Sequence, residues 1–398
     1  MRRIYMDANA TTPLLPEVFD AMRPFWMEHY GNASSIHQQG QYARAAVDDA
    51  RDSIARLLHC RTSEIVFTSG GTESDNLAIF GTLEPSSTPA HLITTSIEHH
   101  AVLHAAESLA SRGIEVTFLP CTAQGLIEPA TLQAAIRPNT RLVSIMFANN
   151  ETGVIHPIAE LAAIAHAAGA LFHTDAVQAA GKLPIDLSPG GPLKDVDLLT
   201  LSGHKIYAPK GIGVLFVRRN VRLAPMLHGG THERQRRAGT ENVAAIVGLG
   251  RAAELANAWL QTDGPDKLTA LRDRLEQGIL THVAECGVNG ARAPRVSNTT
   301  NLYFDHVEAE ALVIALDLKG LSVSGGSACQ SGATEPSHVL TAMGLTPARA
   351  RASIRFSLSK LTTVEEVDEA LTLIPPAVAR LRDLSPTWQK SAATLASA

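Results

Sequence analysis

Cysteine and positive charge are scarce in this sequence, and long apolar runs are missing from it. The 398 residues include four cysteines with no CxxC pair, which argues against a disulfide framework or a structural zinc site. The formal net charge of −5 is not the basic footprint of a nucleic-acid-binding protein. No apolar run approaches the ~18 residues that span a membrane, and the first residues lack a secretory core. We therefore expect a cytoplasmic protein that binds neither nucleic acid nor membrane.

Short apolar runs alternate with helical patterns between residues 64 and 219. This alternation predicts an α/β domain with a mostly parallel sheet. After a turn-rich stretch at 262–267, strand-like segments at 297–305 and 351–360 accompany further helices and predict a smaller α+β domain. The expected strands of the first domain are EIVFTS, HLITTSI, IEVTFLP, RLVSIMFAN, ALFHTDA, VDLLTLSG and GVLFVRR.

Polar residues follow five of these strands directly. In an open parallel sheet, ligands bind outside the carboxyl ends of the strands, so these side chains are expected to share one site. They are Thr68-Ser69, Glu98-His99, Asn149-Asn150, Asp175 and the run from Ser202 to Lys205.

The segment TSGGTESDNLAI, residues 68–79, suits a phosphate. Gly70 and Gly71 allow close approach of the backbone, and the next amides lie at the start of a helix, where Thr72 adds a hydroxyl. The alternative is a plain turn with Thr72 as the helix cap. It is not a P-loop, because no Lys-Ser/Thr pair follows the glycines.

Asp175 and Lys205 each end an apolar strand. A buried acid is costly unless it is paired with a cation, such as a protonated pyridine nitrogen or a basic side chain. A lysine beside low-dielectric walls forms Schiff bases as a neutral amine, although a surface lysine at a strand end is the commoner case.

His99 and Arg355 complete the set of candidate residues. His99 would stack on an aromatic ring or transfer protons, and a metal site at His100 and His104 lacks carboxylate or cysteine partners. Arg355 lies in an alternating strand and would bind a planar carboxylate or form a structural ion pair. A phosphate cradle, a pyridinium partner, a Schiff-base lysine and a carboxylate-binding arginine are together what pyridoxal 5′-phosphate (PLP) needs to act on an amino acid.

Cys329 lies in the segment LSVSGGSACQSGATEPSHVL, residues 321–340, among glycine, serine and alanine. Free cysteine usually behaves as a small buried hydrophobe, and this segment is too rich in glycine and serine for a rigid core. The thiol is therefore a candidate nucleophile on a loop.

The chain resembles the cysteine desulfurases of the NifS/IscS type over nearly its whole length. These are class-V aminotransferase-like enzymes of PLP fold type I. The segments that carry the resemblance are YMDANATTP, NASSIHQQG, FTSGGTESDN, EHHAV, ANNETG, HTDAVQAAGK, SGHKIYAPKGIG, RRAGTEN, GGSACQSG and IRFSLSK.

The resemblance implies a fold, an assembly and an activity. The fold is a seven-stranded, mainly parallel sheet in a large domain at 16–261, with a small α+β domain made from 1–15 and 262–398, in a homodimer. The activity is conversion of L-cysteine to L-alanine, with the sulfur passed through an enzyme persulfide to an acceptor protein such as an iron–sulfur scaffold. The alternatives are a class-V aminotransferase or a carbon–sulfur or carbon–selenium lyase that does not use the cysteine, and an idle scaffold protein.

Each site residue receives a role from the same resemblance. Lys205 forms the Schiff base and takes the α-proton, Asn150 and Arg355 bind the substrate carboxylate, and Cys329 accepts the sulfur. The implied cofactor contacts are Asp175 to the pyridine nitrogen, Gln178 to the ring hydroxyl, His99 stacked on the ring, and Gly71, Thr72, Ser202 and His204 to the phosphate, with Thr240 reaching it from the other subunit. Departures from the usual motifs fall at Thr231, Ala238, Gly325, Ser359 and Lys360, and none removes a catalytic group.

Overall fold

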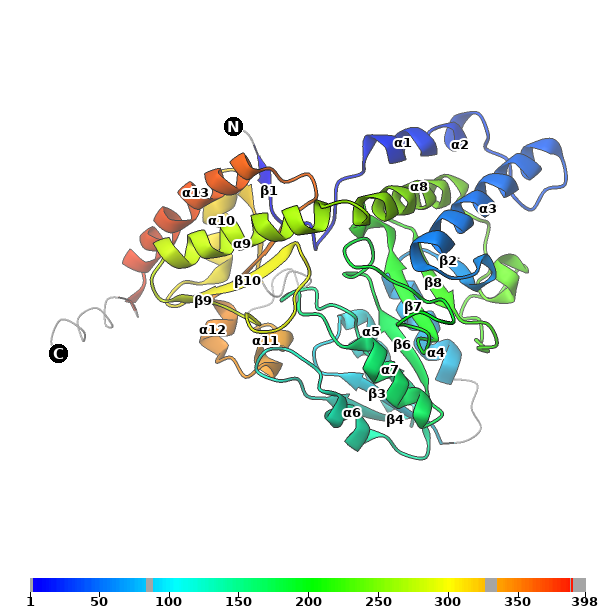
Figure 1. Cartoon of the computed structure of the whole chain (residues 1–398), viewed down its shortest axis with the longest axis horizontal. Coiled ribbons are helices and arrows are strands. Elements are labelled where there is room, and N and C mark those ends of the chain that lie inside the picture. The colour runs from blue at the N-terminus through cyan, green and yellow to red at the C-terminus, as the bar shows by residue number, and fades with distance from the viewer. Residues whose placement is uncertain (1–2, 84–88, 326–334, 387, 389–398) are drawn as a thin grey trace.

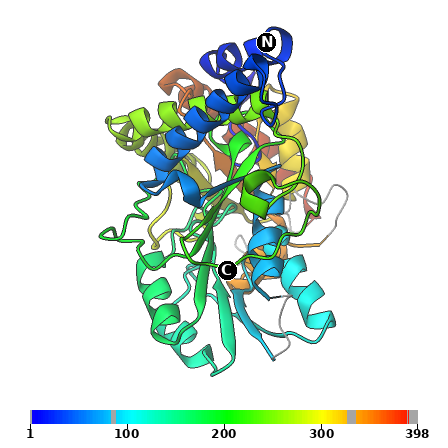
Figure 2. The same cartoon turned by 90° about the vertical axis from the view of Figure 1, so that its right-hand side faces the viewer.

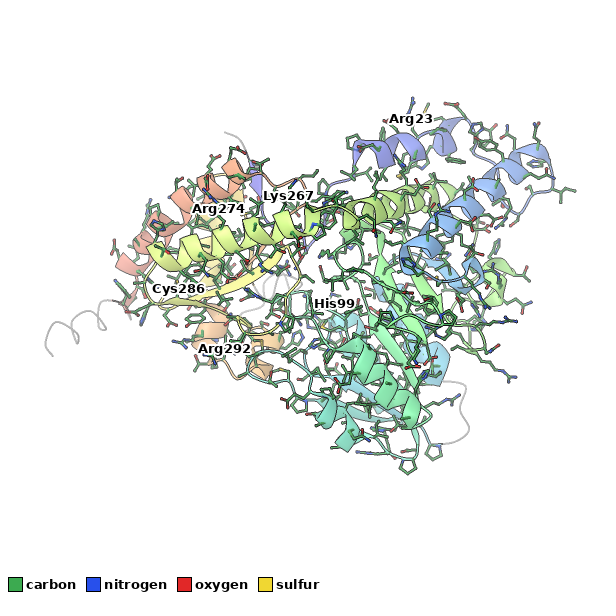
Figure 3. The ribbon with its side chains drawn as sticks, in the orientation of Figure 1. Arg23, His99, Lys267, Arg274, Cys286 and Arg292 are labelled. Atoms are coloured by element: carbon green, nitrogen blue, oxygen red, sulfur yellow. The ribbon has the colours of Figure 1, made fainter. Side chains whose placement is uncertain are left out.

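The computed structural model describes residues 3–83, 89–325, 335–386 and 388, which form two units that lie side by side (Figure 1). The first unit is built on a large sheet with helices on both faces, as the turned view in Figure 2 shows. The second is built on a smaller sheet, and His99, labelled in Figure 3, lies where the two units meet.

The large sheet of the described chain has seven strands in the order β2-β8-β7-β6-β5-β3-β4. β8 is antiparallel to both of its neighbours, and the other pairs are parallel. All seven expected strands are present, and the sheet is mainly parallel as predicted. The strands are β2 (Ile65–Thr68), β3 (His91–Thr95), β4 (Glu115–Leu119), β5 (Thr140–Ser144), β6 (Leu171–Asp175), β7 (Leu198–Ser202) and β8 (Gly213–Val217).

Helices cover this sheet, and short 3₁₀ turns connect several elements. The helices of the first unit are α1 (Pro16–Met22), α2 (Pro24–Met27), α3 (Gln38–Leu58), α4 (Gly71–Leu83), α5 (His100–Ser111), α6 (Pro129–Ala135), α7 (Ile158–Ala167) and α8 (Val243–Leu260). The 3₁₀ turns are η1 (Thr62–Glu64), η2 (Gly203–Lys205) and η3 (His232–Gln235).

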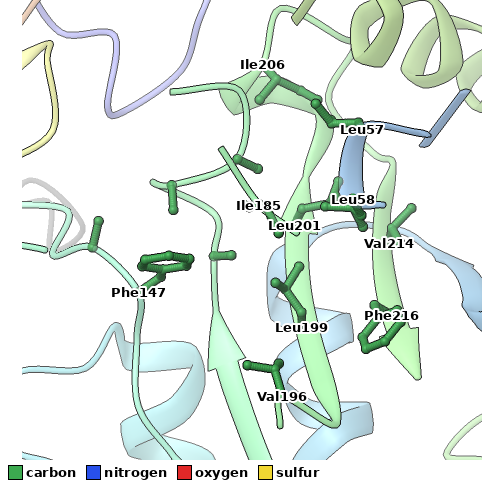
Figure 4. Close-up of a cluster of buried hydrophobic side chains, with 14 of the residues drawn as sticks. Leu57, Leu58, Phe147, Ile185, Val196, Leu199, Leu201, Ile206, Val214 and Phe216 are labelled. Carbon is green, nitrogen blue, oxygen red and sulfur yellow. The ribbon is translucent and has the colours of Figure 1, made fainter. Parts of the chain in front are cut away.

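The strand sequences divide between two helix layers because successive side chains in a strand point to opposite faces. Val214 and Phe216 pack into a core with α3, where Figure 4 shows them near Leu57 and Leu58. Leu215, between them in β8, packs into a separate core with α4 and α5. The continuous apolar run of β8 therefore reflects burial on both faces of the sheet.

Helix α8 corrects one expectation from the sequence. Its 18 residues have a mean hydropathy of 1.2, so by length and composition alone it could cross a membrane, although half of it is buried inside the protein. Gly250 allows α8 to lie close to α3, since an added Cβ would be 2.6 Å from the Cα of Ala50. Packing in a core accounts for the apolar composition of this helix.

The second unit joins segments from both regions of the chain. Its antiparallel sheet has the order β12-β13-β10-β9, and β1 pairs with β11 in parallel. These elements are β1 (Ile4–Tyr5), β9 (Cys286–Val288), β10 (Thr299–Phe304), β11 (Leu321–Ser322), β12 (Ser324–Gly325) and β13 (Ser353–Ser357), with helices α9 (Gly264–His282), α10 (Ala309–Asp317), α11 (His338–Ala342), α12 (Pro347–Arg351) and α13 (Val364–Asp383).

The domain division stays a prediction, and the packing adds detail to it. Ile4 and Met6 are buried in one core with residues of α9, α10 and α13. Val339 and Leu340 of α11 and Ala350 of α12 instead pack into the core of the first unit. The first unit thus takes up part of the chain that follows the predicted boundary.

Candidate active site

A cavity of about 490 Å³ opens at the carboxyl ends of the sheet strands, where the second unit faces them. Residues from many separate segments line it, which is why no single motif describes the site. Among the lining residues are the following sequence-predicted ones: Gly71, Thr72, His99, Asn150, Asp175, Gln178, Ser202, His204, Lys205 and Arg355.

Lys205 lies in η2, directly after the buried strand β7. Its Nζ donates to the carbonyl oxygens of Asn9 at 2.5 Å and Ala10 at 2.8 Å. These two residues precede the first helix of the chain, so an N-terminal segment holds the amine of a residue almost 200 positions later. The two carbonyls orient the amine at the edge of the cavity.

Asp175 ends β6 and is buried, and its Oδ1 accepts a 2.9 Å hydrogen bond from the amide of Val177. Burial raises the pKa of Asp175 to about 6, although the positive charge of Lys205 acts in the opposite direction. A cationic N–H donor in the cavity would favour the ionised carboxylate further. A protonated pyridine nitrogen is such a donor.

His99 caps α5, where its Nδ1 accepts from the amide of Ala101 at 3.2 Å. Burial lowers the pKa of His99 to about 4, and the charge of Lys205 adds to this effect. The imidazole is therefore neutral at neutral pH. Figure 3 places it between the two units, where a neutral ring is suited to stack on a flat ligand.

The start of α4 forms another wall of the cavity. Gly71 opens this helix, and an added Cβ would lie 3.0 Å from Cγ2 of Val177 and 3.5 Å from Cβ of Ser202. Glycine keeps this wall open, and the first amides of the helix can meet an anion there. Thr72, Ser202 and His204 also line the cavity and supply polar side chains near the same end of the sheet.

Arg355 comes from β13 of the second unit and is buried. Its Nη2 donates to Oδ1 of Asp7 at 2.8 Å, and its Nη1 donates to the carbonyl oxygen of Asn150 at 3.0 Å. Among the described residues, nothing accepts a hydrogen bond from its buried Nε. Arg355 therefore forms an ion pair and keeps further donor capacity, because a guanidinium carries five N–H groups.

Asn9 is a central residue of the site that the sequence reading missed. Its side-chain Nδ2 donates to the carbonyl oxygen of Asn150 and to Oγ1 of Thr299. Its backbone N–H donates to Oγ of Ser357. Asn9 is 2% exposed, so these bonds join both units inside the protein. The motif YMDANATTP carries part of the family resemblance. Nothing in its local pattern indicates that Asn9 has these distant partners.

Buried carboxyl groups form a second feature that the sequence reading missed. Burial raises the pKa of Glu98 to about 8 and that of Glu151 to about 7, and it also raises the pKa of Asp75. Glu151 Oε2 accepts a 2.6 Å hydrogen bond from Oγ of Ser337, while the buried Oδ1 of Asp75 has no described hydrogen-bond partner and lies 3.6 Å from Nε2 of His173. The sequence shows that polar residues lie at the strand ends, but it does not show how deeply these carboxyl groups are buried.

Two predicted residues need separate mention. Thr240 is exposed on the surface and is not among the described residues that line the cavity, and Cys329 lies outside the described residues. Glu335, Pro336, Ser337 and His338 line the cavity, so the chain that follows the predicted cysteine loop returns to it.

Three histidine rings near the cavity contact one another in tilted arrangements. The ring of His100 lies 5.0 Å from that of His104 and 4.8 Å from that of His338, between centroids. In residues 3–83, 89–325, 335–386 and 388, no group of three or more His, Cys, Asp or Glu side chains is placed to hold a metal ion.

The residues of the cavity fit PLP in chemical kind. Asp175 can pair with a pyridinium, the start of α4 can meet a phosphate, Lys205 supplies an amine, and Arg355 supplies a guanidinium for a carboxylate. The fold and the site thus define a PLP-dependent enzyme of fold type I that acts on amino acids.

Comparison with known proteins agrees with this class of enzyme and identifies the family within it. The family model described as aminotransferase class-V matches residues 4–370. "Cysteine desulfurase 2" of Trichormus variabilis is 50% identical over 97% of this chain and 96% of its own length, and "Cysteine desulfurase IscS" of Methanosarcina thermophila is 47% identical over 99% and 96%. The chain belongs to the class-V aminotransferase family, in which it is a member of the cysteine desulfurases.

Solved structures give the same result. A "NifS-like protein" matches with a TM-score of 0.87 and 35% identity, covering 95% of this chain and 99% of the other. A structure titled "SspA in complex with cysteine" matches with a TM-score of 0.80 and 37% identity, covering 90% and 100%. Enzymes of this family depend on PLP.

Proposed function

We propose that this chain is a PLP-dependent cysteine desulfurase that converts L-cysteine to L-alanine and passes the sulfur on through a persulfide on Cys329. The observation that carries the proposal is one cavity that is lined both by Lys205 and by Arg355, which comes from the other unit. The names of the relatives and the cysteine complex of a similar structure support the choice of substrate.

The cavity residues hold the cofactor in this proposal. Asp175 pairs with the pyridine nitrogen, Gln178 bonds the ring hydroxyl and His99 stacks on the ring. Gly71, Thr72, Ser202 and His204 bind the phosphate. When bound, PLP withdraws electrons from the α-carbon of an amino acid and so makes its proton acidic.

Arg355 and Lys205 act on the substrate in the same cavity. Arg355 binds the carboxylate through its guanidinium, which Asp7 and the carbonyl of Asn150 hold in a fixed orientation. Lys205 accepts the α-proton. The carbonyls of Asn9 and Ala10 keep its amine at the edge of the cavity during this transfer.

The sulfur step is assigned to Cys329 on sequence grounds. Its thiolate attacks the sulfur of the substrate, a sulfur–sulfur bond forms and the carbon–sulfur bond breaks. The electron pair of that bond stays with the carbon, which takes up a proton and leaves as alanine. The persulfide then transfers its outer sulfur to an acceptor protein, such as an iron–sulfur scaffold.

The proposal includes a homodimer in the cytoplasm. Thr240 is exposed outside the cavity, where it is available to a second copy of the chain. Large exposed side chains on and around α1, α2 and α3 support such an interface: Phe19, Trp26, Met27, Tyr30, Ile36 and Tyr42. Sedimentation at micromolar concentration should give a dimer, and a monomer with full PLP occupancy would contradict the assembly.

The activity is tested with the PLP-loaded protein, L-cysteine and a reductant. We expect alanine and sulfide in equal amounts, without consumption of an amino acceptor. Borohydride reduction should also attach the cofactor to Lys205, as peptide mass spectrometry would show. A requirement for an amino acceptor, or attachment to another lysine, would overturn the proposal.

A further inference from the structure

A second buried lysine, Lys182, lies beside the cavity and contacts the machinery of the site. The segment from Ala176 to Leu183 makes helical turns, in which the amide of Ala180 donates to the carbonyl of Ala176 at 2.8 Å. This spacing puts Gln178 and Lys182 on the same side. Nζ of Lys182 donates to Oε1 of Gln178 at 2.6 Å and to Oδ1 of Asn9 at 3.2 Å.

These contacts fix the amide of Gln178 in one orientation. Oε1 accepts from Lys182, while Nε2 donates to the carbonyl oxygen of Asn9 at 3.1 Å. A flipped amide would set donor against donor and acceptor against acceptor, so the orientation follows from its partners. Nε2 carries a second N–H, and Gln178 lines the cavity. This amide therefore offers an N–H to a ligand and not a carbonyl oxygen.

Lys182 is also linked to the amine of Lys205 through Asn9. The side-chain oxygen of Asn9 accepts from Lys182 and from Asn298, and its main-chain oxygen accepts from Lys205 and Gln178. One asparagine thus connects the two lysines through separate oxygens.

The charge of Lys182 is costly where it lies. Burial, together with the charges of Lys205 and Arg355, lowers its pKa to about 7. In the described part of the chain, none of the ion pairs includes Lys182. A buried cation that lies near other cations and has no carboxylate partner destabilises the fold. Such groups are typical of functional sites.

We propose that Lys182 is a positioning residue for the cofactor: it keeps an N–H of Gln178 turned toward the cavity and places positive charge behind it. On the proposed function, on which this inference rests, that N–H donates to the oxygen of the PLP ring hydroxyl. The nearby charge then favours the deprotonated oxygen.

The first test measures the dissociation constant of PLP for the cofactor-free full-length chain. Lys182→Met keeps the length of the side chain but removes the charge and the donor. We expect it to bind PLP about tenfold more weakly, as for loss of one charge-assisted contact. Lys360→Met is the matched control. Lys360 lies over the ring of Tyr207 beside the same small cavity as Lys182, and this change should alter binding by less than about twofold.

The second test asks whether Lys182 acts through Gln178. In a double-mutant cycle, Lys182→Met should have little further effect on PLP binding once Gln178→Leu is present. Additive losses would overturn the proposal, because they would indicate a general structural role. If Lys182→Met does not fold, Lys182→Gln is measured in the same cycle.

The third test follows the visible absorption of the bound cofactor against pH. Loss of positive charge near the ring oxygen should move the pH midpoint upward in Lys182→Met and leave it unchanged in Lys360→Met. Lys205 and Arg355, the other charged groups that act on Lys182, are retained in both variants. An unmoved midpoint with unchanged PLP affinity overturns the role of Lys182 alone, whereas a wild-type chain that binds no PLP overturns the proposed function.

Discussion

Among the buried arginines that pair with a carboxylate, Arg51 and Arg355 differ in how completely their N–H groups are used. Arg51 on α3 donates from both terminal nitrogens to Glu233, at 2.8 and 2.7 Å, and also to the carbonyl of Ile65. Its guanidinium lies over the ring of Phe67. Arg355 donates to Asp7 and to the carbonyl of Asn150, but its buried Nε has no described partner.

The difference separates a structural pair from a binding site. Glu233 also accepts from the amide of Phe67, so the Arg51 pair is completed by backbone and ring contacts. Arg355 lines the 490 Å³ cavity, and its Nε–H has no acceptor among the described residues. A buried donor without a partner is costly, and it is retained where a ligand completes it. Burial alone would not distinguish the two arginines.

The largest effect is expected when the structural pair of Arg51 and Glu233 is broken. Arg51→Met leaves the carboxylate of Glu233 buried without its cation, and it should lower the free energy of unfolding by about 3–5 kcal/mol. Denaturant titration measures this loss. Replacing both partners, Arg51→Met with Glu233→Leu, should recover most of it. An Arg51→Met variant as stable as the wild type would contradict the structural assignment.

The next effect separates substrate binding from sulfur transfer. If Arg355 binds the substrate, L-cysteine must still bind when the thiol of Cys329 is missing. Cys329→Ser should keep PLP and its spectral change with L-cysteine, while alanine and sulfide release falls at least ~100-fold. Cys286→Ser is the control, because burial raises the pKa of that thiol. Retained alanine production would favour the lyase or aminotransferase alternatives.

A smaller effect is expected at the open pair. Arg355→Met should raise the KM for L-cysteine by about 30- to 100-fold, the scale of a hydrogen-bonded charge pair with the carboxylate. Its stability should fall less than that of Arg51→Met, because the Asp7 side chain is 20% exposed and can be solvated. Steady-state kinetics with denaturant titration gives both values. An unchanged KM would remove Arg355 from the substrate site.

The smallest effect concerns the acid beside Arg355. Burial raises the pKa of Glu151 to about 7, so the folded state keeps a proton that the unfolded state loses above about 4.5. The contribution of Glu151 to the free energy of unfolding is therefore full below pH 4.5. It is lost as the pH rises through 7. The stability of wild type relative to Glu151→Gln should fall by about 1.4 kcal/mol per pH unit between pH 5 and 7. A constant difference over this range would argue against a protonated Glu151.

The features that could be predicted from the sequence are those that depend on nearby residues in the chain, such as strands and the residues at their ends. Asp175 and Lys205 end apolar strands, and the shared edge of a parallel sheet brings such ends together. Asp7, Asn9 and Lys182 were not assigned roles, because their partners lie in segments that no local pattern connects to them. The sequence also gave no sign that α11 and α12 would pack into the core of the first unit. Register between distant segments is a tertiary property, and the hydrophobic period does not encode it.

The bonds of Asp7 and Asn9 have a consequence for synthesis of the chain. Arg355 and Ser357, their partners, follow them by 348 residues each. At 5–20 residues per second, the N-terminal segment waits roughly 20–70 s on the ribosome for these partners. All strands of the large sheet have been made by Val217, but the cavity is closed only by the last part of the chain. The wall of the cavity is therefore incomplete until the segment that carries Arg355 has been translated.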